Sequence, residues 1–348
     1  MDKSKMIVIG HFGFGKELLN GQTVKTRSLT DELKRQLGDG EVICVDTHGS
    51  RLKLIKTLLS LFVIAKRAEN AVMLPAHNGV KVLTPILLHL RRMWGIKLHY
   101  IVIGGWISEM VKVNNSLRKG LKKFDGIYVE TNTMKRSMEA QGFRNVFLMP
   151  NCKSLHILSM EELIYTQQPP LKLCTFSRVM KEKGIEDAVN AVKEINSAEG
   201  KTVFELDIYG QIDSEQTVWF RSLESRFPEY INYRGLVDYD KSTETIKDYF
   251  ALLFPTKFYT EGIPGTIIDA YCAGVPVLSA KWESCEDIIR ENETGYCYGF
   301  DDYEELVQKL RRMADAPDEF NKMKLVCLTE SEKFKSETVV KEFISHIE

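Results

Sequence analysis

The seven cysteines of the chain do not form the pattern of a disulfide framework or of a zinc site. Their number is odd and no C-x-x-C pair occurs, which indicates a reducing compartment. Long apolar runs are also missing: the most apolar segment, residues 57–65, lies between Lys56 and Lys66, whereas a membrane-spanning helix needs about 20 apolar residues. The apolar run after MDKSK is too short for a signal peptide. We therefore expect a cytoplasmic protein without a membrane-spanning segment.

The whole chain has a net charge of only −1, but its two halves carry large net charges of opposite sign. Residues 1–170 contain 25 Lys and Arg against 14 Asp and Glu, a net charge of +11, and residues 171–348 contain 22 against 34, a net charge of −12. Basic clusters stand beside leucine-rich segments at residues 51–56, 66–67, 91–92 and 118–123. Solvated helix faces explain any single cluster. The whole set predicts contact with an anionic membrane surface, and hence a peripheral position at the inner face of the plasma membrane.

The order of apolar and amphipathic segments predicts two α/β domains. A chain of 348 residues exceeds the usual size of a single core. Short apolar runs alternate with helical stretches, which is typical of parallel sheets covered by helices. Strands are predicted at residues 5–11, 41–47, 71–76, 97–105, 126–131, 145–151, 171–179, 203–211, 230–235, 251–256 and 276–280.

A polar, proline-marked connection at residues 165–170 divides this pattern. We expect doubly wound, Rossmann-like domains at residues 1–165 and 166–330, with ligands in a cleft between them. A last helix over about residues 331–348 can pack back on the first domain.

Residues 10–17 read GHFGFGKE and differ by one residue from the phosphate loop of a nucleoside triphosphatase. In that loop the lysine is followed by Ser or Thr, whose hydroxyl ligates magnesium. Here Glu17 follows Lys16, and its carboxylate would repel phosphate. Asn20-Gly21 breaks the helix that should begin at once. The sequence therefore argues against an ATP site.

Two cations flank a tight turn in the second half. Arg178 leaves a predicted strand, and Lys183-Gly184 enters a helix. Five residues apart around a turn, they can meet one diphosphate, and such charge-assisted contacts contribute about 1.5–3 kcal/mol each. Gly210 ends the next strand and allows a ligand to approach the backbone closely.

The stretch FPTKFYTEGIPGTIIDAYCAGVPVLS, residues 254–279, carries the most information. A strand runs into a loop that contains Glu261 and two glycines, and a helix starts near Thr266 with Asp269 in its first turn. Free amides at a helix N-terminus bind anions, and carboxylates accept hydrogen bonds from sugar hydroxyls. These residues predict a polar pocket that tolerates phosphate.

Taken in this order, the three stretches resemble the retaining GT-B glycosyltransferases of family 4, which build bacterial capsule, lipopolysaccharide and exopolysaccharide sugars. The G-R-L-x-x-x-K-G turn of that family is matched by Ser177-Arg178 and Lys183-Gly184, and its E-x7-E motif by Glu261 and Asp269. The resemblance covers the second half and, more loosely, the first. It implies the GT-B fold and a hexosyltransferase, with an N-terminal acceptor domain and a C-terminal donor domain.

The resemblance also implies roles for single residues. Arg178, Lys183 and Glu261 form the catalytic group: the two cations hold the donor diphosphate and Glu261 contacts the donor sugar. Asp269 binds the ribose hydroxyls, with a side chain one methylene shorter than the Glu of the family. The other expected donor contacts are Ser177, Gly210, Gly262, Ile263, Pro264, Gly265 and Thr266.

In the first half the glycine-rich loop is assigned to the acceptor side, followed by a helix that begins near Gln22. The expected acceptor-side residues are Gly13, Gly15, Gly21, Gln22, Gly104, Gly105 and Trp106. Ile103 stands where many relatives have a histidine before the glycine pair. His99 and His11 are candidate substitutes, although a core or surface role is favoured for both.

We thus expect transfer of a sugar from a UDP- or GDP-sugar to a lipid-linked or other glycan, without a cofactor or metal. Asp238-Tyr239-Asp240 spells the metal-binding D-x-D of the other large glycosyltransferase fold, but helix capping by Asp240, with Asp238 in solvent, is favoured. The alternatives are a nucleotide-sugar epimerase or a non-catalytic relative of the same fold, and a nucleic-acid-binding protein that uses the basic half. Nucleic acid is not expected, because no helix-turn-helix, RNP or zinc-finger pattern occurs.

Overall fold

A computed structural model describes residues 4–15, 21–49 and 51–348 of the chain. The chain forms two compact units: unit 1 comprises Met1–Ser154 and Phe334–Glu348, and unit 2 comprises Leu155–Lys333. The chain passes between them after Ser154, 11 residues before the expected division. Residues 155–165 belong to unit 2 because the amide of Leu158 donates to the carbonyl oxygen of Cys272 at 3.0 Å, and Leu158 and Leu163 are buried.

Unit 1 is built on one parallel sheet, whose six strands are those expected from the first half of the sequence. The strands are β1 (Ser4–Gly10), β2 (Val42–Asp46), β3 (Ala68–Leu74), β4 (Lys97–Ile101), β5 (Gly126–Val129) and β6 (Val146–Leu148), in the order β2-β1-β3-β4-β5-β6. The helices are α1 (Gly21–Leu37), α2 (Arg51–Ala65), α3 (His77–Trp94), α4 (Ile107–Val113), α5 (Asn115–Leu121), α6 (Asn132–Ala140) and α13 (Ser336–Ile347), with a 3-10 turn η1 (Asp39–Glu41).

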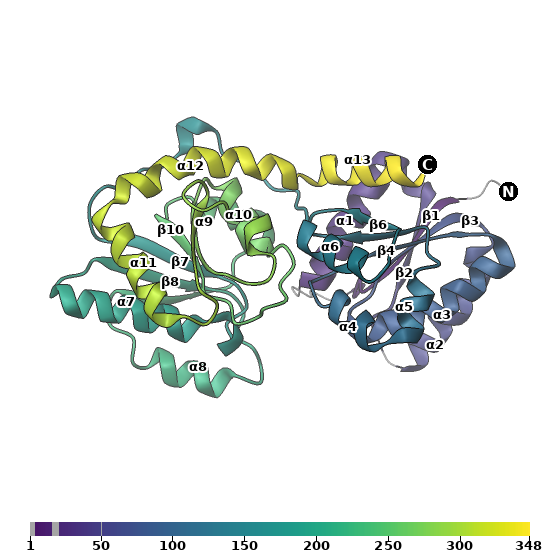
Figure 1. The fold of residues 1–348 in the computed structure, drawn as a ribbon, viewed down its shortest axis with the longest axis horizontal. Coiled ribbons are helices and arrows are strands. Elements are labelled where there is room, and N and C mark those ends of the chain that lie inside the picture. The colour runs from purple at the N-terminus through teal and green to yellow at the C-terminus, as the bar shows by residue number, and fades with distance from the viewer. Residues whose placement is uncertain (1–3, 16–20, 50) are drawn as a thin grey trace. The chain divides into compact units, whose positions relative to one another are not determined.

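Both faces of this sheet are buried, as the continuous apolar strand sequences require. Along β1 the side chains alternate: Ile7 and Ile9 pack with α2 to α6, whereas Met6 and Val8 pack with α1 and α13. The yellow helix α13 lies beside α1 (Figure 1) and places Val340 and Phe343 in that second core. The last helix therefore completes the first unit, although it is more than 300 residues from β1 in the sequence.

Unit 2 contains a second parallel sheet in the order β12-β11-β10-β7-β8-β9. Its strands are β7 (Leu171–Phe176), β8 (Phe204–Tyr209), β9 (Ile231–Gly235), β10 (Ala251–Phe254), β11 (Val277–Ala280) and β12 (Gly295–Tyr298). Its helices are α7 (Ile185–Glu199), α8 (Thr217–Glu224), α9 (Ser242–Ile246), α10 (Gly265–Cys272), α11 (Tyr303–Asp315) and α12 (Pro317–Ser331), with 3-10 turns η2 (Met160–Glu162), η3 (Lys181–Lys183), η4 (Tyr239–Lys241), η5 (Cys285–Asp287) and η6 (Glu332–Phe334). The sequence predicted five of the six strands and missed the edge strand β12.

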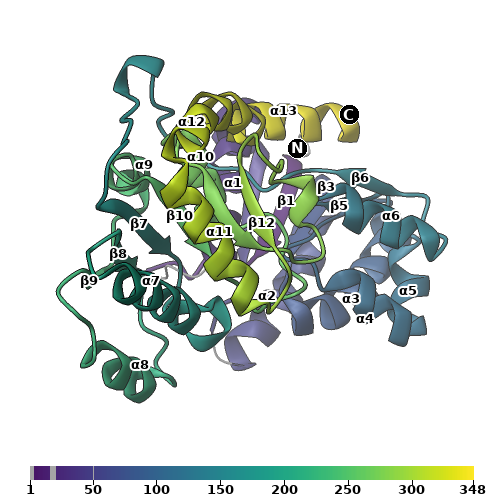
Figure 2. The same cartoon turned by 60° about the vertical axis from the view of Figure 1, so that its left-hand side comes forward.

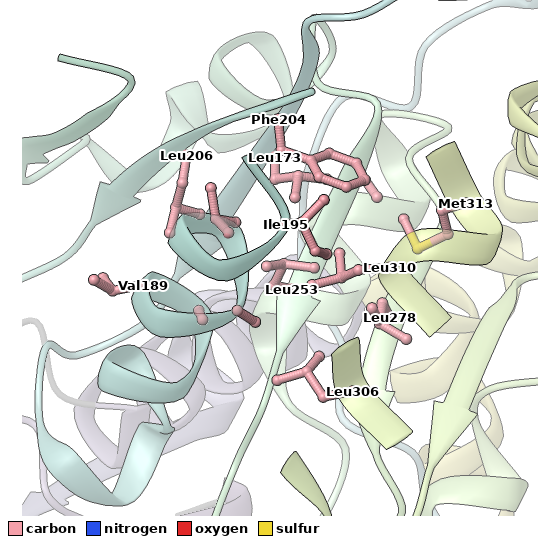
Figure 3. Close-up of a cluster of buried hydrophobic side chains, with 14 of the residues drawn as sticks. Leu173, Val189, Ile195, Phe204, Leu206, Leu253, Leu278, Leu306, Leu310 and Met313 are labelled. Atoms are coloured by element: carbon pink, nitrogen blue, oxygen red, sulfur yellow. The ribbon is translucent and has the colours of Figure 1, made fainter. Parts of the chain in front are cut away.

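Helices cover both faces of the second sheet. Helices α7 and α11 lie side by side (Figure 2) and bury one face, where Leu173, Ile195, Leu253 and Leu310 meet (Figure 3). Helix α10 contacts α9 and α12. The helices packed on the sheet fix its strands. The loops at the carboxyl ends of these strands therefore have rigid bases on which a site can be built. The expected α/β fold with two doubly wound sheets is confirmed.

Candidate active site

The second sheet reverses direction of winding between β7 and β10. Strands β8 and β9 follow β7 on one side, and β11 and β12 follow β10 on the other. The loops after β7 and β10 therefore diverge, and in such sheets ligands bind where adjacent loops part. The loop after β7 carries Arg178 and Lys183, and the loop after β10 carries Glu261. The sequence-predicted catalytic residues thus come from the two loops that border the switch point.

Lys183 and Glu261 form an ion pair at this position. The Nζ atom of Lys183 contacts Oε1 of Glu261, and the two side chains are only 17% and 18% exposed. Lys183 Nζ also lies 5.3 Å from the ring centroid of Phe254 and 5.1 Å from that of Phe258. Aromatic faces attract an ammonium group, so the lysine is held by one carboxylate and two rings.

The carboxylate of Glu261 has a second donor within its own loop. The hydroxyl of Thr256 donates to Oε1 at 3.1 Å, and the amide of Phe258 donates to that hydroxyl oxygen at 3.2 Å. Thr256 is buried, so the contact fixes the direction of the Glu261 side chain. Thr256, Phe254 and Phe258 were not among the sequence-predicted residues; their position immediately before Glu261, after a buried strand, was the available signal.

Two backbone contacts join the loops. The amide of Lys257 donates to the carbonyl oxygen of Glu182 at 2.8 Å. Gly184 has φ of +68°, and a Cβ atom there would lie 1.8 Å from the carbonyl oxygen of Pro255. Only glycine fits this approach. The two halves of the site are therefore packed against each other at the level of the main chain.

Gly210 lies against the neighbouring loop of the site. Its φ is +132°, and an added Cβ atom would lie 1.8 Å from the carbonyl oxygen of Ser177. The close approach that requires glycine in this structure is thus to the loop that carries Arg178, and the ligand contact expected at Gly210 stays a prediction. Arg178 is 53% exposed, and its Nη1 atom lies 3.3 Å from Oδ2 of Asp213. Asp213 therefore pairs with the arginine beside the turn.

Helix α10 begins at Gly265, directly after the Glu261 loop, with Pro264 as its N-cap and no capping side chain. The Oγ1 atom of Thr266 is buried and has no hydrogen-bond partner among the described residues. A buried hydroxyl without a partner is costly, which makes Thr266 an unusual residue at the start of the helix. Gly262 and Ile263 are buried beside it.

Asp269 does not lie in the first turn of α10, contrary to the sequence prediction. It is the fifth residue of the helix and only 2% exposed, and its Oδ1 atom accepts a hydrogen bond from Ser242 Oγ at 3.0 Å. This contact joins α10 to α9. The carboxylate is buried inside the unit, and one of its oxygens accepts from Ser242.

The glycine-rich loop of unit 1 encloses an internal carboxylate. Asp46, at the end of β2, accepts hydrogen bonds from the amides of Phe12, Gly13, Phe14 and His48 at 2.8–3.3 Å. Burial raises the pKa of Asp46, but these amides stabilise its charged form and together bring the pKa below its usual value. The amides that would bind phosphate in a phosphate loop are thus already occupied. Lys16 and Glu17 lie outside the described residues.

The two candidate histidines occupy different environments. His11 Nδ1 lies 2.8 Å from Thr23 Oγ1, and its Nε2 lies 2.8 Å from Nδ1 of His48. Burial and the neighbouring His48 lower the pKa of His11. His99 is 2% exposed and contacts Asn70 at 3.1 Å, and burial lowers its pKa to about 4. His99 is therefore a neutral core residue, as favoured, whereas His11 belongs to the loop cluster.

The other residues predicted for the acceptor side lie at or after the carboxyl ends of strands of the first sheet. Helix α1 begins at Gly21, and Gln22 Nε2 donates to the carbonyl oxygen of Leu74 at the end of β3. Trp106 is the N-cap of α4, and its ring centroid lies 5.1 Å from that of His77. Gly13 and Gly15 lie in the loop after β1, and Gly104 and Gly105 in the loop after β4.

The D-x-D triplet is on the surface, and its second acid does not cap a helix. Asp238 is 74% exposed and lies 3.3 Å from Nζ of Lys241. Helix α9 begins at Ser242 with Lys241 at its N-cap and no side-chain cap, so the expected capping by Asp240 is wrong. In the described part of the chain, no group of three or more His, Cys, Asp or Glu side chains is arranged to hold a metal ion.

Comparison with known proteins finds similarity over the region that contains this site. The family model described as glycosyl transferases group 1 matches residues 165–324, which contain Arg178, Lys183, Glu261 and Asp269. Unit 2 is therefore similar in sequence to the group 1 glycosyltransferases. No curated protein matches the sequence.

Solved structures share the fold of the whole chain. TarM of S. aureus is 12% identical with a TM-score of 0.66, over 83% of this chain and 57% of TarM, so the chain spans little more than half of that protein. Sucrose-phosphate synthase of Thermosynechococcus elongatus is 13% identical with a TM-score of 0.74, over 99% and 98% of the two chains. HepE of Anabaena in complex with UDP is 10% identical with a TM-score of 0.74, over 98% of each. The expected two-domain fold is thus shared with these structures, and residues 165–324 are similar to the group 1 glycosyltransferases.

Proposed function

We propose that the protein is a retaining glycosyltransferase that transfers a sugar from UDP- or GDP-sugar to a lipid-linked glycan in cell-surface polysaccharide synthesis. The observation that carries the proposal is the Lys183–Glu261 pair at the switch point of a group 1 glycosyltransferase domain. One of the similar structures, HepE, was solved with UDP and glucose, which supports a nucleotide-sugar donor for this fold.

In this proposal each group acts on one part of the donor. Lys183 and Arg178 stabilise the negative charge that develops on the leaving diphosphate, and Thr266 with the first amides of α10 adds uncharged donors. Glu261 holds hydroxyls of the transferred sugar. Two fixed cations supply the charge that a divalent ion would provide, so transfer is proposed to proceed without metal.

The test is donor hydrolysis by the purified protein in EDTA, screened over UDP- and GDP-sugars, with the anomer of the released sugar identified by NMR before mutarotation. A retaining enzyme releases an α-sugar from an α-linked donor, and Glu261→Gln should abolish the release. Release of an epimerised sugar would instead identify an epimerase. No turnover with any donor, although UDP or GDP binds, would identify a non-catalytic relative.

Contact with an anionic membrane is proposed for unit 1. Leu59 and Val63 of α2 are 64% and 65% exposed, one helical turn apart, between the exposed Lys56 and Lys66. Exposed apolar residues flanked by cations suit the boundary of an acidic bilayer. None of the described helices has both the length and the apolar run required to span a bilayer.

Vesicle binding tests this contact. Vesicles that contain phosphatidylserine should bind the protein less as salt rises, since charges are screened over about 8 Å at physiological ionic strength. Lys56→Glu with Lys66→Glu should weaken binding, and Lys201→Glu, an exposed lysine of unit 2, should not. Equal binding to neutral vesicles would contradict the electrostatic contact, and no binding at low salt would favour a soluble acceptor.

A further inference from the structure

Two cysteines of unit 2 lie in contact although the chain has no cysteine motif. The Sγ atoms of Cys285 and Cys297 are 3.1 Å apart. Cys285 begins the turn η5 and is fully buried, whereas Cys297 lies on the edge strand β12 and is half-buried. The sulfurs need to approach by only about 1 Å to reach the ~2 Å length of a disulfide bond. The fold thus places a buried thiol directly beneath a more accessible one.

We propose that Cys285 and Cys297 form an oxidisable dithiol site, which a peroxide converts to a disulfide that alters the loop carrying Glu261. The sulfur of Cys297 attacks one oxygen of the peroxide, the O–O bond breaks, and a sulfenic acid and water form. The sulfur of Cys285 then attacks the sulfenic sulfur, the S–O bond breaks, and the hydroxide takes the thiol proton as water. Two thiols lose two electrons in total, and one hydrogen peroxide becomes two waters.

The order of these steps follows from the two environments. A hydrogen bond with Cys297 and burial both raise the pKa of Cys285. Cys285 therefore remains a protonated thiol that a peroxide in solution does not reach, whereas Cys297 is accessible from the edge of the sheet. Thiolate character and exposure determine which cysteine is oxidised first. A resolving thiol in contact then favours the disulfide over further oxidation.

The turn that holds Cys285 is bonded to the candidate active site. The amide of Cys285 donates to the carbonyl oxygen of Trp282 at 3.0 Å, and the amide of Glu283 donates to the carbonyl oxygen of Tyr259 at 2.9 Å. The buried ring of Trp282 lies 5.5 Å from Phe254, the residue beneath Lys183. A displacement of Cys285 towards Cys297 therefore acts on residues 254–261. The effect on donor binding rests on the proposed function, whereas the disulfide itself does not.

The first experiment treats the full chain with hydrogen peroxide and maps disulfides by mass spectrometry before and after dithiothreitol. We expect a Cys285–Cys297 linkage in the wild type and in Cys44→Ser, which removes the other half-buried cysteine. Cys285→Ser should instead accumulate a sulfenic acid at Cys297 that dimedone traps. Retention of both thiols, or pairing of either with another cysteine, would overturn the site.

The second experiment compares the reduced and oxidised protein by hydrogen exchange and by UDP and GDP binding. We expect faster exchange in residues 254–265 and at the amide of Glu283, and nucleotide binding weakened at least about 3-fold, because charge-assisted contacts depend on geometry. A disulfide that leaves exchange and binding unchanged would overturn the coupling. Altered exchange in a protein that binds neither nucleotide in either state would leave the coupling intact and count against the proposed function alone.

Discussion

Replacement of Lys183 by Met tests whether this side chain binds the donor diphosphate or only Glu261. Lys183 Nζ is paired with Glu261. A bound diphosphate must take over this ammonium group, so binding replaces one charge-assisted contact by another. Such a contact contributes about 1.5–3 kcal/mol, and 1.4 kcal/mol corresponds to a factor of ten in affinity. Lys183→Met should therefore weaken UDP or GDP binding about 10- to 100-fold while the methionine keeps the packing on Phe254 and Phe258.

Glu261→Gln is the matched control. It removes the negative charge that competes with the diphosphate for Lys183, and it keeps the shape of the side chain. Nucleotide affinity should stay equal or rise, since Lys183 no longer has to leave a carboxylate, whereas turnover should fall because the sugar loses its partner. Titration calorimetry with UDP and GDP gives the affinities, and the double variant completes a cycle. Wild-type affinity in Lys183→Met would refute the placement of the diphosphate. A nucleotide affinity lowered equally in both single variants would show that the pair is only structural.

Three further outcomes are expected. Lys25→Met should destabilise unit 1 by about 3–5 kcal/mol in urea unfolding, because Glu130, 4% exposed beside a lysine 7% exposed, would lose the buried counter-charge of its ion pair; Lys25→Met with Glu130→Leu should recover most of the loss, and an unstable double variant would contradict this. Asp238→Asn with Asp240→Asn should leave turnover in EDTA unchanged and stability within about 0.5 kcal/mol, and a strict magnesium or manganese requirement abolished by that change would contradict metal-independent transfer. Gly210→Ala should cost about 1–3 kcal/mol, because its Cβ would lie 1.8 Å from a carbonyl oxygen at a φ of +132°; unchanged stability would show that the neighbouring loop yields.

The strands could be predicted because a strand that is buried on both faces of its sheet has a continuous run of apolar residues in the sequence. Runs such as MIVIG and ALLF are apolar throughout, and polar turns bound them. The edge strand β12, GYCY, was missed because it contains no Val, Ile or Leu and directly follows the polar segment ENET, so it has no aliphatic run. The domain boundary was misplaced for a related reason: the segment from Leu155 to Tyr165 has no regular strand or long helix, and only its contacts with unit 2 assign it there.

The site could be predicted as a set of residues but not as an arrangement. Order along the chain brought Arg178, Lys183 and Glu261 to the carboxyl ends of β7 and β10, because parallel strands place those ends at one edge. Spacing could not show that Lys183 binds Glu261, nor that Asp269 is directed to Ser242, because both contacts join segments 27 or more residues apart. At Gly210 the sequence indicated that another group approaches the backbone closely, but only the fold shows the carbonyl oxygen of Ser177 at this position.

The distribution of charge now has a physical interpretation for each half. The loop of unit 1 that resembles a phosphate loop satisfies its amides with Asp46, so a phosphate there would meet a carboxylate that already occupies the donors. Unit 2, in the acidic half, nevertheless holds two cations, Arg178 and Lys183, and the start of α10 at one sheet edge. Net charge governs long-range association, whereas a site depends on the few groups within contact distance. The proposed nucleotide site therefore lies in the acidic half, and the basic clusters of the first half remain available for the proposed contact with an anionic surface.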